Sequence, residues 1–217
     1  MKCTVIGLGR FGYQLATSLA DQGMEVLAID SNETIIASIR DKVTQAVCLR
    51  VTSEDSLLTL GIEDMDTVVV AMGEDFAQSI LITALLKKNL NVKNVISRAV
   101  SKIHENILIL VGADRVVFPE QDIGIKLANN LAFSLIEFFQ VTEKFALTEI
   151  EAPKSFVGKT LSSINLKKSR QVSCIGVNVD DEINLIDPDY VVQQGDKLLF
   201  AGNNDKLADL AEEKEEE

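Results

Sequence analysis

A glycine-rich segment near the start of the chain has the spacing of a phosphate-binding turn. Gly7, Gly9 and Gly12 form the pattern Gly-x-Gly-x-x-Gly. The pattern lies between a short apolar run, residues 2–6, and an amphipathic stretch that predicts a helix. Gly7 permits a tight turn, Gly9 lets a phosphate approach backbone N–H groups at the positive end of the helix, and Gly12 lets the helix pack on the strand. The segment is therefore suited to binding the phosphates of a nucleotide.

An acidic residue follows where a nucleotide-binding sheet would contact the ribose. Asp30 closes the next apolar run, 18 residues after Gly12, and its carboxylate would accept hydrogen bonds from ribose hydroxyls. The same charge would repel a 2′-phosphate, which argues against NADP. Arg10 and Arg98 supply cations that could meet the distal phosphates of ADP or ATP. These residues leave open whether a mononucleotide or a dinucleotide binds.

The elements that must position these residues alternate between short β-branched runs and amphipathic stretches. Such alternation, from residue 2 to about 140, is typical of a parallel sheet with helices on both faces. The fold class expected is α/β, a doubly wound Rossmann-like sheet. The predicted strands are residues 2–6, 25–30, 46–49, 67–70, 94–97 and 115–118, with helices that include residues 11–22, 32–40 and 76–88.

A longer amphipathic stretch follows this region, and the pattern then changes. Apolar residues at near-helical spacing predict a linking helix with an apolar face, and they are Ile123, Leu127, Leu131, Leu135 and Phe139. Alternating strand patterns beyond it predict a small α+β domain. The expected organisation is a nucleotide-binding domain at residues 1–121, a crossover helix at 122–142, a C-terminal domain at 143–210 and an acidic tail at 211–217.

Charge and hydropathy exclude several classes of partner. The chain carries 21 Lys and Arg residues against 33 Asp and Glu residues, a net charge of −12, so we expect no nucleic-acid partner and no direct binding to an anionic membrane. No apolar run approaches the roughly 18 residues of a membrane helix, and the first residues lack the features of a signal peptide. A cytoplasmic location is expected.

The sequence offers few of the residue sets that catalysis requires. It has no Ser-His-Asp set, no metal-binding cluster and no phosphate-loop lysine motif. Its single histidine, His104, lies in a polar helix start, where it could be a surface residue or a functional one. The chain is therefore predicted to sense a nucleotide and not to be an enzyme. The alternatives are an NAD-dependent oxidoreductase and a stand-alone nucleotide-binding module.

Five motifs in order resemble the RCK (regulator of K+ conductance) proteins. The likeness runs from residue 2 to about 207 and is greatest to the cytosolic gating subunits of Ktr/Trk potassium uptake systems. The chain has the length of the short Ktr type, with one N-domain and one C-domain. The motifs occupy residues 7–12, 26–30, 60–62, 112–120 and 150–161.

The resemblance implies an assembly and a function. Such proteins have a Rossmann-like N-domain, a crossover helix and a small C-domain, and their homodimers assemble into a ring, commonly an octamer. The ring lies beneath an integral-membrane K+ channel subunit of the Ktr/Trk type, so the protein is peripheral to the membrane through that partner. It binds ATP or ADP, in some members NAD(H), and gates K+ flux by changing the conformation of the ring.

The resemblance also implies a set of nucleotide-binding residues. Arg10 and Phe11, in the glycine segment, belong to the phosphate site, and Arg98 and His104 belong to the same nucleotide site. The residues expected around the ribose and the base follow successive strands, and they are Asp30, Ser31 and Asn32, then Arg50 and Val51, then Met72, Gly73 and Glu74.

Two further ligands follow from the resemblance. Glu120, in the sequence Phe-Pro-Glu, matches a carboxylate associated with a cation near the phosphates at the dimer interface, which would be Mg2+, Ca2+ or Na+. Some relatives bind cyclic di-AMP at the C-domain. Lys167, Lys168 and Arg170 supply enough charge there for an anion, but no motif is matched, and that ligand is left open.

Overall fold

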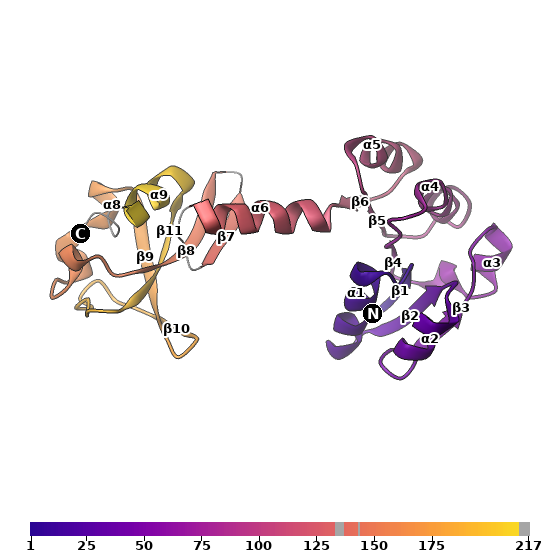
Figure 1. Cartoon of the computed structure of the whole chain (residues 1–217), viewed down its shortest axis with the longest axis horizontal. Helices are drawn as coiled ribbons and strands as arrows, with labels where there is room; N and C mark the ends of the chain where they lie inside the picture. The colour runs from indigo at the N-terminus through magenta and orange to yellow at the C-terminus, as the bar shows by residue number, and fades with distance from the viewer. Residues whose placement is uncertain (133–136, 143, 213–217) are drawn as a thin grey trace. The chain divides into compact units, whose positions relative to one another are not determined.

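The chain folds into two compact units, Met1–Pro119 and Glu120–Glu217, which are described separately (Figure 1). The structure is a computed structural model, and it describes residues 1–132, 137–142 and 144–212. Within these ranges, no helix combines the length and the apolar character that crossing a bilayer requires.

The first unit is built on a six-stranded parallel sheet with the strand order β3-β2-β1-β4-β5-β6. The strand order reverses at β1, which pairs with β2 on one side and with β4 on the other. Ile6 at the end of β1 is in register with Ile29 and with Val70, so the carboxyl ends of these strands share one edge. The strands are β1 (Lys2–Ile6), β2 (Glu25–Asp30), β3 (Gln45–Cys48), β4 (Thr67–Val70), β5 (Val95–Arg98) and β6 (Arg115–Val117).

Helices connect these strands, and the sheet separates the core into two apolar clusters, one on each face. One cluster contains Ala16 of α1 and Ile39 of α2, and the other contains Leu57 of α3 and Ile82 of α4. Because both faces of the sheet are covered, β4 is buried along its whole length, and its sequence shows no alternation of apolar and polar residues. The elements are α1 (Arg10–Asp21), α2 (Glu33–Ile39), α3 (Glu54–Leu58), η1 (Ile62–Asp64), α4 (Phe76–Ala84), η2 (Leu85–Asn89) and α5 (Lys102–Val111).

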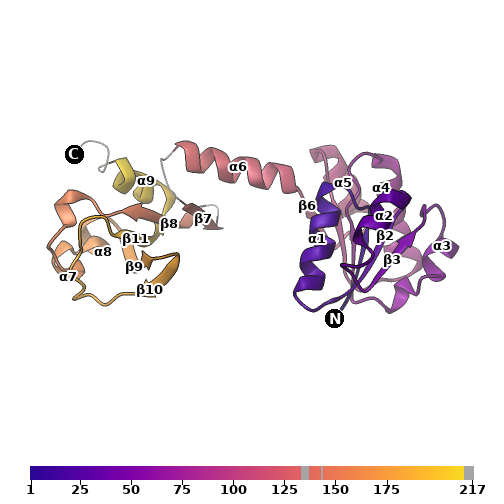
Figure 2. The same cartoon turned by 60° about the horizontal axis from the view of Figure 1, so that its bottom comes forward.

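This architecture confirms the predicted α/β doubly wound fold (Figure 2). The predicted strands at residues 2–6, 25–30 and 67–70 have the observed bounds, whereas β3 and β5 are displaced by one residue from the predicted ranges. The register explains the second displacement, since Arg98 pairs with Val117 of β6 and so extends β5 beyond its apolar run.

The second unit contains a five-stranded antiparallel sheet with the strand order β10-β9-β11-β8-β7. Its core gathers Phe200 of β11, Ile150 of β8 and Leu207 of α9, all of which are buried. The elements are α6 (Pro119–Ala132), β7 (Glu137–Thr142), β8 (Phe145–Glu151), η3 (Lys154–Phe156), α7 (Leu161–Ile164), α8 (Leu166–Ser169), β9 (Val172–Val179), β10 (Glu182–Leu185), β11 (Lys197–Asn203) and α9 (Asn204–Glu212).

The predicted crossover helix at residues 122–142 is wrong at residues 137–142. Helix α6 ends at Ala132, and residues 137–142 form β7, in which Phe139 pairs with Leu147 of β8. Phe139 and Val141 are an aromatic and a β-branched residue at a spacing of two, which suits a strand. Leu135 of the predicted helical face lies outside the described residues. Of the predicted acidic tail, residues 211–212 belong to α9, and residues 213–217 also lie outside the described ranges.

Candidate nucleotide-binding site

The glycine segment forms a tight turn between β1 and α1. Gly7 has a φ of +91°, and a Cβ built on it would lie 2.7 Å from Cγ of Met72. A Cβ on Gly12 would lie 1.9 Å from the carbonyl oxygen of Gly7, so α1 can approach the turn only with glycine at this position. A Cβ on Gly9 would have open space around it. Two of the three glycines thus permit close packing, and the third leaves the backbone accessible.

The N-terminus of α1 has no side-chain cap. Gly9 is the N-cap residue, and the first turn contains no acidic residue. By contrast, α2, α4 and α5 each begin with a side chain that accepts from the backbone of the first turn, namely Asn32, Asp75 and Ser101. The accessible N–H groups of α1 and the positive end of its dipole can therefore bind an anion such as a phosphate.

Asp30 connects the glycine segment to the end of β2. Its Oδ2 accepts a hydrogen bond of 2.7 Å from the N–H of Leu8, and its Oδ1 accepts one of 2.8 Å from the N–H of Asn32. Each ionised carboxylate oxygen can accept about two hydrogen bonds, so both oxygens retain capacity for ribose hydroxyls. Asp30 is thus both a fixed acceptor at the sheet edge and a support for the phosphate turn.

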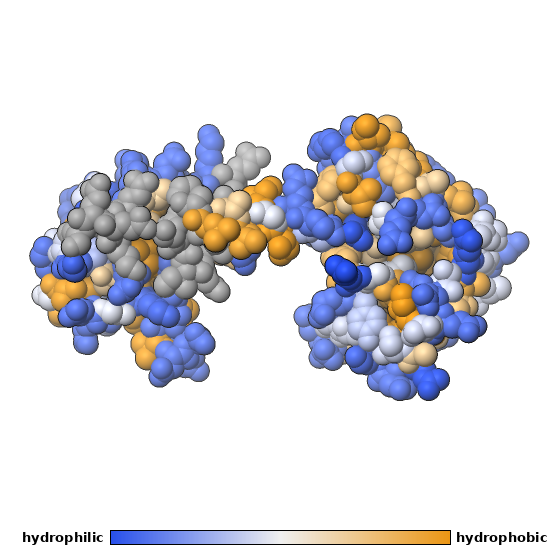
Figure 3. Space-filling view, viewed as in Figure 1, coloured by the Kyte–Doolittle hydropathy of each residue, from blue (hydrophilic) through white to orange (hydrophobic). Residues whose placement is uncertain are grey.

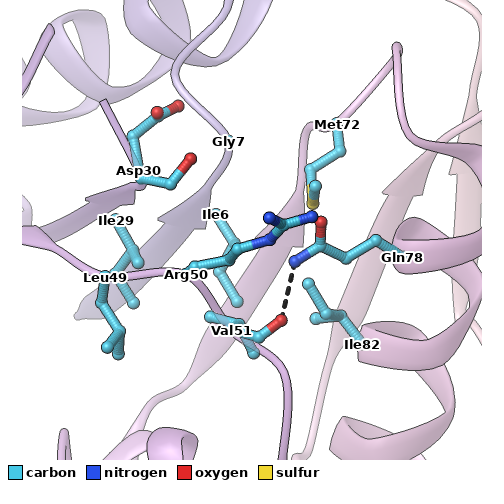
Figure 4. A pocket seen from close by; sticks show the side chains of 11 residues that line it. Ile6, Gly7, Ile29, Asp30, Leu49, Arg50, Val51, Met72, Gln78 and Ile82 are labelled. Carbon is cyan, nitrogen blue, oxygen red and sulfur yellow. Dashed lines mark hydrogen bonds between the residues drawn. The ribbon is translucent and has the colours of Figure 1, made fainter.

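A pocket with apolar and polar lining residues lies beside Asp30 at the carboxyl ends of the strands (Figure 4). Its volume is about 50 Å3, well below the roughly 300–1,000 Å3 typical of small-molecule sites. Six residues from the predicted set line it, and they are Gly7, Asp30, Ser31, Arg50, Val51 and Met72. The sequence interpretation missed the other lining residues, which are Ile6, Ile29, Leu49, Gln78 and Ile82.

A second group of predicted residues meets at the ends of β4 and β5. The guanidinium carbon of Arg98 lies 5.9 Å from the centre of the Phe11 ring, at a distance typical of a cation–π contact. A Cβ on Gly73 would lie 2.6 Å from a guanidinium nitrogen of Arg98. Glycine at position 73 therefore lets Arg98 lie against the backbone after β4, and the contact with Phe11 brings it beside the glycine segment.

Other predicted residues occupy the same edge without entering the pocket. Arg10 is exposed at the first position of α1, and Glu74 is exposed after β4. The side chain of Asn32 caps α2, because its Oδ1 accepts from the N–H of Thr34 at 2.9 Å. Asn32 therefore has a structural role, and its amide NH2 is the group left for a ligand.

Glu120 is exposed in the first turn of α6, in the second unit. Among the residues whose placement is described, no group of three or more His, Cys, Asp or Glu side chains is arranged to hold a metal ion. A cation at Glu120 would thus need ligands beyond the described residues of this chain, such as nucleotide phosphates or a second copy.

Two of the three predicted cations of the C-terminal domain, Lys167 and Arg170, line separate hollows of the second unit, and Lys168 lines neither of these two hollows. Lys167 lines one of them together with Asn165 and Cys174. Arg170 lines the other together with Lys206. The cations thus do not converge on one hollow, and a cyclic dinucleotide site stays an open prediction.

His104 is fully buried near the start of α5. Its ring lies 4.3 Å from the ring of Phe76, centre to centre, and its Nδ1 accepts a hydrogen bond of 3.4 Å from the N–H of Val100. Burial lowers the pKa of the imidazole below its ordinary value of 6.5, because the charged form loses hydration. The structure thus places His104 inside the unit and does not place it in the lining of the pocket.

The burial of His104 predicts a pH dependence of stability. The unfolded chain takes up a proton near pH 6.5, whereas the folded chain takes it up at a lower pH, so stability should fall as the pH drops below 6.5. The slope contributed by this group is at most about 1.4 kcal/mol per pH unit. Urea unfolding between pH 7.5 and 5.5 should show a smaller decrease for His104→Gln than for the wild type. Equal slopes would contradict the burial of a neutral imidazole, and no other histidine can contribute.

Two family models match the chain at the positions of the two units. The TrkA-N domain matches residues 3–119, and the TrkA-C domain matches residues 147–214. The first of these matches covers more than half of the chain.

Curated relatives match over nearly the full length. "Ktr system potassium uptake protein A" of Vibrio alginolyticus is 35% identical over 206 residues, which cover 94% of this chain and 93% of the relative. "Ktr system potassium uptake protein C" of Bacillus subtilis (strain 168) is 32% identical over 202 residues, which cover 92% and 90%.

Solved structures share the fold. The GsuK channel bound to NAD is 20% identical, has a TM-score of 0.55 and covers 100% of this chain and 39% of its own. The same channel bound to ADP matches 60% of this chain and 33% of its own, at 25% identity and a TM-score of 0.52.

Proposed function

The chain belongs to the family of TrkA-N and TrkA-C (RCK) domain proteins, and we propose that it is the regulatory subunit of a Ktr-type potassium uptake system. It binds ATP or ADP at the carboxyl edge of its first sheet and gates K+ flux through a Ktr-type membrane subunit. It is not an enzyme. The similarity to the two Ktr proteins over nine-tenths of the chain supports this role.

One observation carries the nucleotide-binding part of the proposal. The uncapped N-terminus of α1, the carboxylate of Asp30 and the pocket beside it lie along one sheet edge. Their chemistry matches phosphate, ribose and base in that order. Calorimetric titration of the purified chain with ATP, ADP and NAD tests it. Saturable binding of ATP and ADP is expected, and no heat from any adenine nucleotide would overturn it.

The proposed assembly is a ring of homodimers, in which copies of the chain cover apolar faces that one copy exposes. Figure 3 shows apolar side chains over α5 and along α6. In α5, Ile103 and Leu110 are 70% and 79% exposed. In α6, Ile123 and Leu131 are 65% and 75% exposed. Exposed apolar surface of this kind is typical of a partner interface, and a second chain would also supply further ligands for a cation at Glu120.

Arg10 is proposed to bind the third phosphate of ATP. It lies beside the uncapped turn, and a hydrogen bond from a cation to a phosphate is worth roughly 1.5–3 kcal/mol. Arg10→Ala should therefore weaken ATP binding at least about tenfold and change ADP binding less than about threefold, as measured by calorimetry.

Arg40→Ala is the matched control for this experiment. Arg40 is also exposed, with a side-chain exposure of 69%, but it is the C-cap residue of α2 and lies outside the glycine segment. Its removal should leave both affinities unchanged. An Arg10→Ala protein that still prefers ATP over ADP by the wild-type ratio would refute the assignment.

A further inference from the structure

Gln78 presents an amide to the base side of the pocket, and the orientation of that amide is fixed. Its Nε2 donates a hydrogen bond of 2.7 Å to the carbonyl oxygen of Val51 (Figure 4). Because a backbone carbonyl can only accept, the group facing Val51 must be the amide NH2. The backbone N–H of Gln78 donates in turn to Oδ1 of Asp75, the cap of α4, at 2.9 Å. The bond to Val51 therefore orients the side-chain amide, and the cap fixes the backbone of Gln78 in the first turn of α4.

The fixed orientation leaves the amide oxygen as the group available to a ligand. Apolar side chains, including Met72 and Ile82, line part of the pocket, and the other side-chain acceptors of its lining are Asp30 and Ser31, at the end of β2. The 6-amino group of adenine is a donor, whereas the 6-oxo group of hypoxanthine or guanine is an acceptor. The Gln78 oxygen would accept from the first and repel the second.

We propose that Gln78 is the residue that selects adenine over 6-oxopurines at this site. The inference rests on the proposed function, because it requires that the base of a bound nucleotide enters this pocket. The site would then respond to adenine nucleotides and would ignore inosine and guanosine nucleotides of equal charge. A site that pairs a buried polar group with its ligand rejects an analogue that leaves the group unpaired.

Arg50 is the competing determinant. Its side chain extends across the same pocket toward Met72 and Gln78 (Figure 4). A guanidinium is a donor and favours the acceptor edge of a 6-oxopurine, so Arg50 would produce the opposite preference if it contacted the base edge. Arg50 is exposed, whereas the Gln78 amide is oriented by its hydrogen bond to Val51, and we therefore assign the base edge to Gln78 and the open face of the ring to Arg50.

Calorimetry with three triphosphates that differ only at the purine ring tests the proposal. ATP carries the 6-amino group, purine riboside triphosphate carries hydrogen in its place, and ITP carries a 6-oxo group. The wild-type chain should bind ATP at least tenfold more tightly than ITP, with purine riboside triphosphate in between. This ratio requires no variant and no refolding.

Two variants assign the preference to a side chain. Gln78→Met keeps the length of the side chain and removes its oxygen, so the ratio of ATP to ITP affinity should fall below threefold. Gln78→Ala also removes the oxygen and should give the same ratio. It replaces the methionine variant if that variant does not fold. Gln14→Met makes the same substitution at an exposed position of α1, outside the pocket. This control should keep the wild-type ratio. Arg50→Ala should keep it as well.

The outcomes separate this inference from the proposed function. Wild-type protein that binds none of the three triphosphates would overturn the nucleotide site and the inference with it. Tight binding of ATP and ITP with equal affinity would overturn the role of Gln78 alone. A preference for ATP that survives Gln78→Met, or that disappears with Arg50→Ala, would likewise overturn it.

Discussion

Gly12→Ala is expected to lower the stability of the first unit by about 3 kcal/mol and to abolish measurable ATP binding. The added Cβ would lie 1.9 Å from the carbonyl oxygen of Gly7 and 3.0 Å from Cβ of Ala71. The first of these neighbours is backbone, so no side-chain rotation relieves the contact. Either α1 moves away from the sheet or the glycine turn changes shape, and both changes displace the N–H groups that would hold the phosphates.

Urea unfolding and calorimetry measure the two effects, and Gly9→Ala is the matched control for the effect on stability. A Cβ on Gly9 meets no atom within 4 Å, and the φ of −61° at this position suits any residue. Its stability should stay within about 0.5 kcal/mol of the wild type. A Gly12→Ala protein with unchanged stability would show that α1 does not pack against the turn as described.

Asp30→Ala is expected to weaken ATP binding at least about 100-fold. The substitution removes the acceptor of the Leu8 N–H and that of the Asn32 N–H together with the proposed ribose bonds. Leaving a partly buried N–H unpaired costs roughly 1–3 kcal/mol, and a hydrogen bond to a charged group contributes roughly 1.5–3 kcal/mol. The turn should therefore loosen and the ribose should lose its acceptor in the same variant.

Asp30→Asn separates these two roles. The asparagine oxygen can still accept from one backbone N–H, but its NH2 group cannot accept from the other. The loss of affinity should thus be intermediate, at about tenfold. Asp41→Asn, whose side chain is 89% exposed, is the control for a loss of charge and should bind ATP like the wild type. Calorimetry showing unchanged ATP affinity in Asp30→Ala would remove Asp30 from the site.

The sequence predicted those parts of the fold that depend on local patterns. The spacing of Gly7, Gly9 and Gly12 was sufficient to predict the turn between β1 and α1, because each glycine meets a steric or backbone requirement of that turn. Asp30 could be placed beside it because it ends the next apolar run. Buried parallel strands such as β4 could also be predicted from the sequence, because they are short runs of β-branched residues.

The parts that depend on tertiary contacts could not be predicted. The apolar residues at positions 131, 135 and 139 fit helical spacing, and pairing with β8 decided that residues 137–142 form a strand. The burial of His104 depends on Phe76 of another helix. Gln78 belongs to no motif. The sequence indicates that it lines the pocket only through its position four residues before Ile82, on the same face of α4.

The central claim is that this chain converts nucleotide binding into control of K+ flux. The most direct test is K+ flux into proteoliposomes that contain a Ktr-type membrane subunit, with and without this chain, in the presence of ATP or ADP. Flux should depend on the added chain and should differ between ATP and ADP, and Asp30→Ala should remove that difference. A flux that is the same with and without the chain under both nucleotides would contradict the claim.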